Sequence, residues 1–269
     1  MRVAAWRPQN LTDRSFYVAF PDDDCLARDL AVAAGERLLK LRASGMTVDD
    51  LRRAGDLGSH EYLAAELARV RPHDAVLSEE AVDDPARLTA ERAWIIDPLD
   101  GTREFGEEGR VDWAVHVALW ERGDLTAGAV ALPAQDAVLS TAEPPPAPPA
   151  LAPEAALRLV VSRSRPPEFV QRLAEQVGAE LVPLGSAGAK SAAVITGEVD
   201  AYVHSGGQYE WDSAATVAVA RSAGLHTSRI DGSYLRYNSE KPWMPDILIC
   251  PVPLAGRLLD AISSVQREQ

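Results

Sequence analysis

Apolar residues recur at helical spacing near the start of the chain. Over residues 26–41, leucine and alanine return at intervals of three and four, which is typical of a helix with one buried face. The three aspartates at 22–24 precede this run, and acidic residues there cap a helix and suit its dipole. The pattern predicts a first helix over this run and a second over about 59–70.

Short apolar runs follow, and they predict strands. The runs at 75–77 and 93–96 each stop abruptly at acidic residues, as buried strands do where they emerge from a sheet. Residues 113–119 alternate between apolar and other positions, and the segments 130–132 and 137–139 flank a turn that contains proline. These patterns predict an antiparallel sheet and an α+β first half.

A proline-rich segment interrupts the chain near its middle. The text PPPAPP at 144–149 cannot supply the hydrogen bonds of a helix or a sheet, because proline has no N–H group. We therefore predict an extension over 1–20, an α+β domain over 21–143, a linker over 144–153 and a second domain over 154–269.

Strands and helices alternate beyond this linker, which predicts an α/β second half. No element is assigned after Gly224. The expected order is strand 157–161, helix 166–177, strand 180–183, helix 187–196, strand 199–204 and helix 212–223.

Composition and charge narrow the range of partners. The chain has 269 residues, of which 46% are hydrophobic, so it can bury a substantial core. Its 40 acidic residues outnumber 27 basic ones and give a formal charge of -13. Such a charge repels polymeric nucleic acid and anionic membranes. A small phosphorylated metabolite remains a suitable partner, because bound cations can invert the local field.

Cysteine usage and hydropathy point to a reducing compartment. Cys25 and Cys250 are far apart and in no metal or redox spacing, so we expect two buried thiols. No apolar run approaches the roughly 18 residues of a membrane span. The first 20 residues also lack the pattern of a signal peptide. A cytoplasmic location is therefore expected, and a homodimer is one possible assembly.

The text WIIDPLDGT at 94–102 is the strongest candidate for chemistry. An apolar strand here ends in two carboxylates, Asp97 and Asp100, and oxygen ligands of this kind suit Mg²⁺. The turn can aim both acids and the Leu99 carbonyl at one region. If a helix opens at Gly101 and Thr102, their N–H groups can receive a phosphate oxygen. Taken alone, two acids beside a glycine turn are also common as turn formers and helix caps.

Three further acids lie where they can converge with this turn. Glu79 follows an upstream strand, Asp56 is expected to precede a helix, and Asp212 is expected to open a late helix. Each could be explained separately, for example as a cap or a solvated surface charge. Together with Asp97 and Asp100 they predict a metal site.

The combination resembles the inositol monophosphatase superfamily from about residue 24 to the end. The motifs that carry the resemblance are SEE at 78–80, WIIDPLDGT at 94–102 and EWD at 210–212. The texts PLDGTREF and GSAGAK are similar to those of the 3′(2′),5′-bisphosphate nucleotidase branch. The resemblance implies a two-domain, layered α-β-α-β-α sandwich of the inositol monophosphatase and fructose-1,6-bisphosphatase type.

The resemblance also implies roles for individual residues. One magnesium ion would be held by Glu79, Asp97 and the Leu99 carbonyl, and another by Asp97, Asp100 and Asp212, with a third ion possible. Asp56 and Thr102 would orient and deprotonate the attacking water. Many relatives have Thr-x-Ala-Asp where this chain has Ala54-Gly55-Asp56, so the role of Asp56 depends most on the structure. The residues expected to contact substrate are Leu99, Asp100, Gly101, Thr102, Arg103, Ser186, Gly188, Lys190 and Asp212.

For this branch the implied substrate is 3′-phosphoadenosine 5′-phosphate, with its sulfated analogue as a possible second substrate of the same site. Lithium inhibition and a place in sulfur metabolism are implied as well. Counting back from Asp212, Ser205 stands where inositol phosphatases present an acid to the inositol hydroxyls. Lys190 is expected to border the substrate, where it can bind a second phosphate. The alternative is an inositol monophosphatase or a broader sugar-phosphate phosphatase.

Two alternatives to this function are an enzyme of another family and a protein without catalysis. The text DPLDGT is similar to the D-x-D-G-T of haloacid-dehalogenase-type phosphatases, in which the first aspartate is a covalent nucleophile. The extra residue between the acids and the position in mid-chain argue against that reading. The second alternative is a non-catalytic sensor that binds a nucleotide or inositol phosphate through the same pocket, but it would have no need for the complete set of acids and Thr102.

Overall fold

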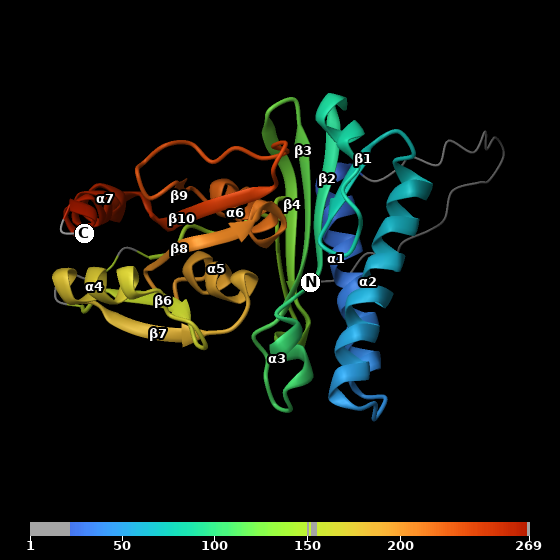
Figure 1. The fold of residues 1–269 in the computed structure, drawn as a ribbon, viewed down its shortest axis with the longest axis horizontal. Helices are drawn as coiled ribbons and strands as arrows, with labels where there is room; N and C mark the ends of the chain where they lie inside the picture. The colour runs from blue at the N-terminus through green and yellow to red at the C-terminus, as the bar shows by residue number, and fades with distance from the viewer. Residues whose placement is uncertain (1–21, 150, 152–154, 268–269) are drawn as a thin grey trace, which may run out of the picture.

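Figure 1 shows a sandwich in which two sheets alternate with three layers of helices. This computed structural model describes residues 22–149, 151 and 155–267. The expected α-β-α-β-α architecture is confirmed. The outer layers are α1 (Asp23–Arg42) with α2 (Val48–Val70) and α4 (Glu168–Val177) with α7 (Val252–Arg267), and the central layer is α5 (Ala187–Ile195) with α6 (Ala214–Ser222).

The first sheet has the order β1-β2-β3-β4-β5 and is antiparallel except at one edge. β1 runs parallel to β2, so the two strands end side by side. The acids that follow these strands are therefore neighbours. The strands are β1 (Ala75–Ser78), β2 (Arg92–Asp100), β3 (Ala114–Glu121), β4 (Asp124–Leu132) and β5 (Ala137–Ser140).

The second sheet has the order β7-β6-β8-β10-β9. β6 is parallel to both β7 and β8, whereas β10 is antiparallel to its two neighbours. The carboxyl end of β8 points toward the first sheet (Figure 1). The strands are β6 (Arg158–Ser162), β7 (Glu180–Leu184), β8 (Ala201–Tyr209), β9 (Leu225–Ser228) and β10 (Trp243–Pro251).

Short elements connect the sheets and helices. Two of them, α3 and η3, carry residues of the candidate site. They are α3 (Thr102–Gly106) and the 3-10 turns η1 (Pro85–Thr89), η2 (Pro133–Gln135) and η3 (Glu210–Asp212).

Small side chains build the central helical layer. α5 and α6 are rich in alanine, and their buried residues join residues of both sheets in one core. Gly128 of β4 lies so close to α6 that a Cβ atom there would sit 2.6 Å from the Cβ of Ala218. Because packed interiors hold few voids, side-chain size in this layer determines how closely the sheets approach.

Two helix starts that bear on the site differ from the prediction. α2 begins at Val48 rather than near Ser59, so Asp56 lies within this helix and not before it. Charged residues and two glycines obscure the helical period in its first half. The helix expected to open at Asp212 begins at Ala214 instead, because η3 precedes it.

The remaining expectations concern segments and thiols. The predicted extension over residues 1–20 lies outside the described residues, and the division at the 144–153 linker stays a prediction.

Cys250 is buried as expected, but Cys25 is only half-buried, because it lies in the first turn of α1. None of the helices in the described part of the chain is long and apolar enough to cross a membrane.

Candidate active site

The parallel pair β1–β2 places Glu79 beside Asp97. Ser78 is paired with Ile96, so the next residue of each strand emerges at the same end of the sheet. The carboxyl groups of Glu79 and Asp97 are in hydrogen-bond contact. Strand pairing thus brings together two acids that are separated in the sequence by a helical turn and a strand.

A bulge in β2 turns Asp97 and Asp100 toward the same side. Side chains alternate along a regular strand, so residues three apart would face opposite sides. Asp97 is paired with His116 and Asp100 with Ala114, so three steps on β2 match two steps on β3. His116 and Ala114 share one face of β3, and the two aspartates therefore share a side as well. Pro98, which has no N–H to donate, lies within the bulge.

η3 brings Asp212 from the second half of the chain to these aspartates. The Asp212 carboxylate accepts a hydrogen bond from the Tyr209 N–H at 2.6 Å, which fixes its direction. One carboxylate oxygen from each of Asp97, Asp100 and Asp212 lies within 4.8 Å of the other two. A ligand set made only of oxygen atoms suits a hard cation such as Mg²⁺.

The pKa values of three of these acids are raised, which indicates that the negative charge of the cluster is only partly compensated. Burial, followed by the charges of the neighbouring acids, raises the pKa of Asp97 well above its usual value. Burial and then the charge of Asp212 raise the pKa of Glu79 to about 7, although the residue is exposed at the rim. Burial and then Asp100 raise the pKa of Asp212 to about 6. A divalent cation would relieve this repulsion, so the residues fit magnesium.

Asp100 differs from the other acids because hydrogen-bond donors surround it. Its carboxylate accepts the N–H of Ala187 at 3.1 Å and the N–H of Gly188 at 2.5 Å, both at the start of α5. His116 Nε2 lies 3.2 Å from Asp100 Oδ2. Burial raises the pKa of Asp100, but His116, Lys190 and the Gly188 N–H outweigh it, so the net direction is downward.

His116 is a site residue that the sequence analysis missed. Its buried ring donates from Nδ1 to the Trp211 carbonyl oxygen at 3.0 Å. Burial alone would lower the pKa of His116, but the Asp100 carboxylate acts in the opposite direction, and the net direction is upward. His116 stands between Val115 and Val117 in a buried strand, and a titratable residue inside such a strand is a usable signal.

Asp56 and Thr102 lie together, as the family resemblance implied. Thr102 Oγ1 is 3.0 Å from Asp56 Oδ1 and 3.2 Å from the Leu99 carbonyl oxygen. Burial raises the pKa of Asp56 to about 6, against the lowering effect of the Thr102 hydrogen bond. The structure explains why glycine stands before Asp56 in this chain, because a Cβ atom at Gly55 would lie 2.8 Å from Leu99 Cδ2. The glycine lets α2 approach the β2 bulge.

Gly101 and Ser186 place two predicted substrate-binding segments in contact. Gly101 has φ 86°, a left-handed conformation that favours glycine. A Cβ atom at Gly101 would lie 2.9 Å from the Cβ of Ser186. Ser186 caps α5 by accepting the Ala189 N–H at 2.8 Å. The start of α3 and the start of α5 therefore form neighbouring walls of the site.

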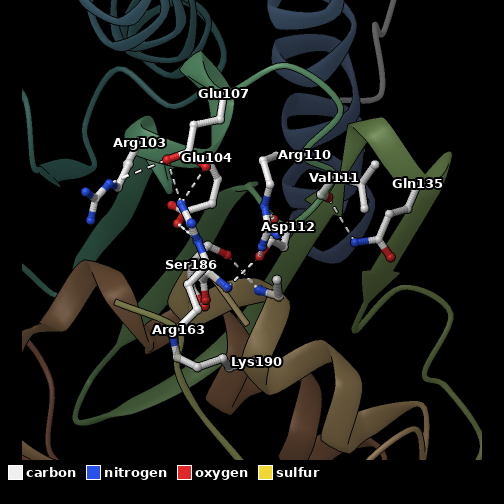
Figure 2. Close-up of polar contacts among 12 residues, drawn as sticks. Arg103, Glu104, Glu107, Arg110, Val111, Asp112, Gln135, Arg163, Ser186 and Lys190 are labelled. Atoms are coloured by element: carbon white, nitrogen blue, oxygen red, sulfur yellow. Dashed lines mark hydrogen bonds and ion pairs between the residues drawn. The ribbon is translucent and has the colours of Figure 1, made fainter. Parts of the chain in front are cut away.

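Lys190 lies deeper than expected. Its side chain is 7% exposed, and its Nζ donates to the carbonyl oxygens of Gly185 at 2.7 Å and Ser186 at 2.6 Å. In Figure 2 it lies below Ser186, on the first turns of α5. Lys190 thus supports the loop before α5. Arg103, by contrast, is exposed and lies 3.6 Å from Glu107.

Comparisons with known proteins agree with this geometry. The sequence profile described as "Inositol monophosphatase family" matches residues 25–266. A 3′-phosphoadenosine 5′-phosphate phosphatase of Mycobacterium leprae is 47% identical over 94% of this chain and 98% of that protein. The protein of the same name from Mycobacterium tuberculosis is 49% identical over 87% and 91%.

Solved structures agree as well. CysQ from Bacteroides thetaiotaomicron, described as a bacterial member of the inositol monophosphatase family, is 26% identical. It matches with a TM-score of 0.75 over 87% of this chain and 98% of that one. SuhB from Mycobacterium tuberculosis is 25% identical and matches with a TM-score of 0.71 over 90% and 96%. With its layered fold and its acids gathered from β1, β2 and η3, the chain belongs to the inositol monophosphatase family.

Proposed function

We propose that this protein is a magnesium-dependent phosphomonoesterase that hydrolyses the 3′-phosphate of 3′-phosphoadenosine 5′-phosphate. The products would be adenosine 5′-phosphate and inorganic phosphate, and water is the only other reactant. The observation that carries the proposal is the convergence of Asp97, Asp100 and Asp212 within 4.8 Å. The substrate is suggested by the 47–49% identical relatives that bear this activity in their names.

The proposed metal ligands divide into two sets that share Asp97. Glu79, Asp97 and the Leu99 carbonyl oxygen would hold one magnesium ion, and Asp97, Asp100 and Asp212 would hold another, with a third ion possible. Magnesium bound there would supply Lewis-acid stabilisation of the attacking and leaving oxygens of an in-line displacement. Asp97 is the only member of both sets, so its substitution should affect both.

The chain's own residues would handle the proton of the attacking water. Thr102 can accept a hydrogen bond from water while it donates its own proton to Asp56, 3.0 Å away. Asp56, with a pKa of about 6, is mostly ionised at neutral pH and can receive the proton. This relay needs no covalent enzyme intermediate. A rapid-quench search should accordingly find no aspartyl-phosphate, whereas the haloacid-dehalogenase alternative requires one.

A panel of phosphate esters tests the substrate. It compares 3′-phosphoadenosine 5′-phosphate, its sulfated analogue, inositol 1-phosphate and fructose 1,6-bisphosphate, each with and without magnesium. We expect kcat/KM for 3′-phosphoadenosine 5′-phosphate to exceed that for inositol 1-phosphate by at least about tenfold, or about 1.4 kcal/mol. The reason is that Ser205 leaves no acid to repel a second phosphate. A better rate with inositol 1-phosphate would replace the proposal by a general sugar-phosphate phosphatase.

A further inference from the structure

The exposed aromatic side chains of the described residues gather in one place. Tyr209, Tyr234 and Trp243 are 45%, 51% and 50% exposed. Tyr209 and Trp243 are cross-strand partners with ring centroids 5.5 Å apart, and Tyr234 and Trp243 line the same pocket. Exposed aromatic clusters on a soluble protein commonly mark a binding surface.

The rings are held in fixed orientations. Tyr209 is stacked on Trp211, with centroids 4.6 Å apart and an angle of 8° between the planes. Trp243 lies against Gly207, where a Cβ atom would be only 1.7 Å from its Cζ2. Gly207 has φ 91°, so a side chain there is disfavoured by conformation as well as by space. Half of the Trp243 side chain is exposed, so part of the indole is accessible to a ligand.

The residues that line the adjoining pocket include two arginines and no acidic residue, whereas acidic residues predominate in the whole chain. Its volume is about 350 Å³, and Arg229, Arg236, Ser239 and Trp243 are among its lining residues. Asp246 neutralises Arg229 through bonds of 2.7 and 2.6 Å. Arg236 makes no hydrogen bond or ion pair within the described ranges. An unpaired guanidinium beside an aromatic face is a suitable partner for a phosphorylated nucleoside.

One short turn connects this pocket to the metal cluster. Within η3, Glu210 accepts the N–H of Asn238 at 2.7 Å and of Ser239 at 2.9 Å, and its own N–H donates to the Pro242 carbonyl. Asp212, two residues later, belongs to the carboxylate cluster. The pocket wall and a proposed metal ligand are therefore positioned by the same three residues.

We propose that this pocket binds the nucleoside end of the substrate, with Trp243 stacking on the base and Arg236 pairing with the phosphate that is not hydrolysed. The inference rests on the proposed function, because it assigns the part of the same substrate that lies away from the metals. Stacking on an aromatic side chain suits a purine, and a guanidinium can bind phosphate through two parallel hydrogen bonds.

Equilibrium binding of the product and its two fragments tests the assignment. Calorimetry in magnesium buffer compares adenosine 5′-phosphate, adenosine and ribose 5-phosphate as probes, so no turnover is needed. Trp243→Ala should weaken adenosine 5′-phosphate and adenosine by about tenfold and leave ribose 5-phosphate unchanged. Trp243→Phe keeps an aromatic face and should restore most of the affinity.

Arg236→Gln should show the complementary pattern. Loss of a charged hydrogen-bond partner is expected to weaken adenosine 5′-phosphate and ribose 5-phosphate by about tenfold, with adenosine unchanged. Arg257→Gln, at an exposed position of α7, is the matched control and should alter none of the three. The melting temperature of each variant verifies that the fold is intact.

Two results would overturn the assignment. One is unchanged binding of adenosine 5′-phosphate in both Trp243→Ala and Arg236→Gln, and the other is an equal loss for all three probes in either variant. Hydrolysis of 3′-phosphoadenosine 5′-phosphate by the unaltered protein is measured separately. Turnover without these binding effects would leave the proposed function intact and remove only the pocket assignment.

Discussion

Asp97 is the acid of the site on which the charges of the other three carboxyl groups act together. It is buried, it contacts Glu79, and Asp100 and Asp212 raise its pKa further. Burying an uncompensated carboxylate costs free energy, and groups in this situation bind protons or cations to reduce the cost. The site therefore reduces the stability of the metal-free fold and increases its affinity for divalent cations.

Asp97→Asn should separate these two effects. We expect kcat/KM to fall by about 10³-fold or more, because both proposed metal sites lose a charged ligand. The metal-free variant should nevertheless melt at or above the temperature of the unaltered protein, since one source of repulsion has gone. Melting curves with and without magnesium measure the second effect. Substantial magnesium-dependent activity in the variant would contradict the two-site assignment.

The same repulsion predicts how stability depends on pH. The pKa of Glu79 is raised to about 7 and that of Asp212 to about 6, and unfolding returns both to ordinary carboxyl values. The folded state therefore binds more protons than the unfolded state, and the metal-free protein should lose stability as pH rises from 5 to 8. Saturating magnesium should flatten this dependence. Asp212→Asn serves as control and should make this dependence shallower without magnesium, because it removes one of the two raised carboxyl groups and part of the charge that raises the other.

At the scale of elements, the site depends on places where regular structure is interrupted. The β2 bulge aligns Asp97 with Asp100, and η3 rather than a helix start presents Asp212. The start of α5 reaches Asp100 because Gly188 has no side chain. Each interruption is short, but each determines the direction of a carboxylate.

Gly188→Ala tests the approach of α5. A Cβ atom there would lie 2.2 Å from His116 Nε2 and 3.0 Å from Asp100 Oδ2, so α5 must move away. We expect a loss of about 1–3 kcal/mol in the free energy of unfolding, together with lower kcat. Gly256→Ala in α7 meets no atom within 4 Å and should be neutral or slightly stabilising. Denaturant melts of both variants make the comparison, and equal effects would contradict it.

The site could be predicted from the sequence where the signal was local. Apolar runs that end in acids located β1 and β2, and the family resemblance to the motif around Asp97 is confirmed. The signal failed where distant contacts decide the structure. The first half of α2 contains Gly55, which is required by Leu99 rather than by helix propensity. β10 was also missed, and its register is determined by pairing with β8 and β9.

At the scale of the whole molecule, a charged network joins the two halves beside the site. Figure 2 shows Arg163, from the second half, pointing to Glu104 and Glu107 of the first. Asp112 accepts the Gly185 N–H and also pairs with Arg110. The loop before α5 is thus held against the segment that follows the proposed metal ligands.

Arg163→Gln should weaken this junction. Glu104 is buried and would lose its charged partner, so we expect a loss of about 1–3 kcal/mol in the free energy of unfolding. Adding Glu104→Gln should recover part of that loss, because no buried charge then remains unpaired. Arg172→Gln, which removes an exposed pair with Glu168, is the matched control. Additive losses in the double variant would contradict the coupling.

The alanine-rich layer also acts as a spacer that sets the width of the site from a distance. Asp97 and Asp100 belong to the first sheet and Asp212 to the second half of the chain, and α6 approaches the first sheet so closely at Ala218 and Gly128 that a Cβ atom at Gly128 would not fit. Ligand distances of about 2.0–2.1 Å for Mg²⁺ and 2.3–2.6 Å for Ca²⁺ differ by less than the size of one methyl group. A side chain added in this layer would have to be accommodated by a shift of α6, so we expect the relative affinity of the site for the two cations to depend on side-chain size at Gly128 and Ala218.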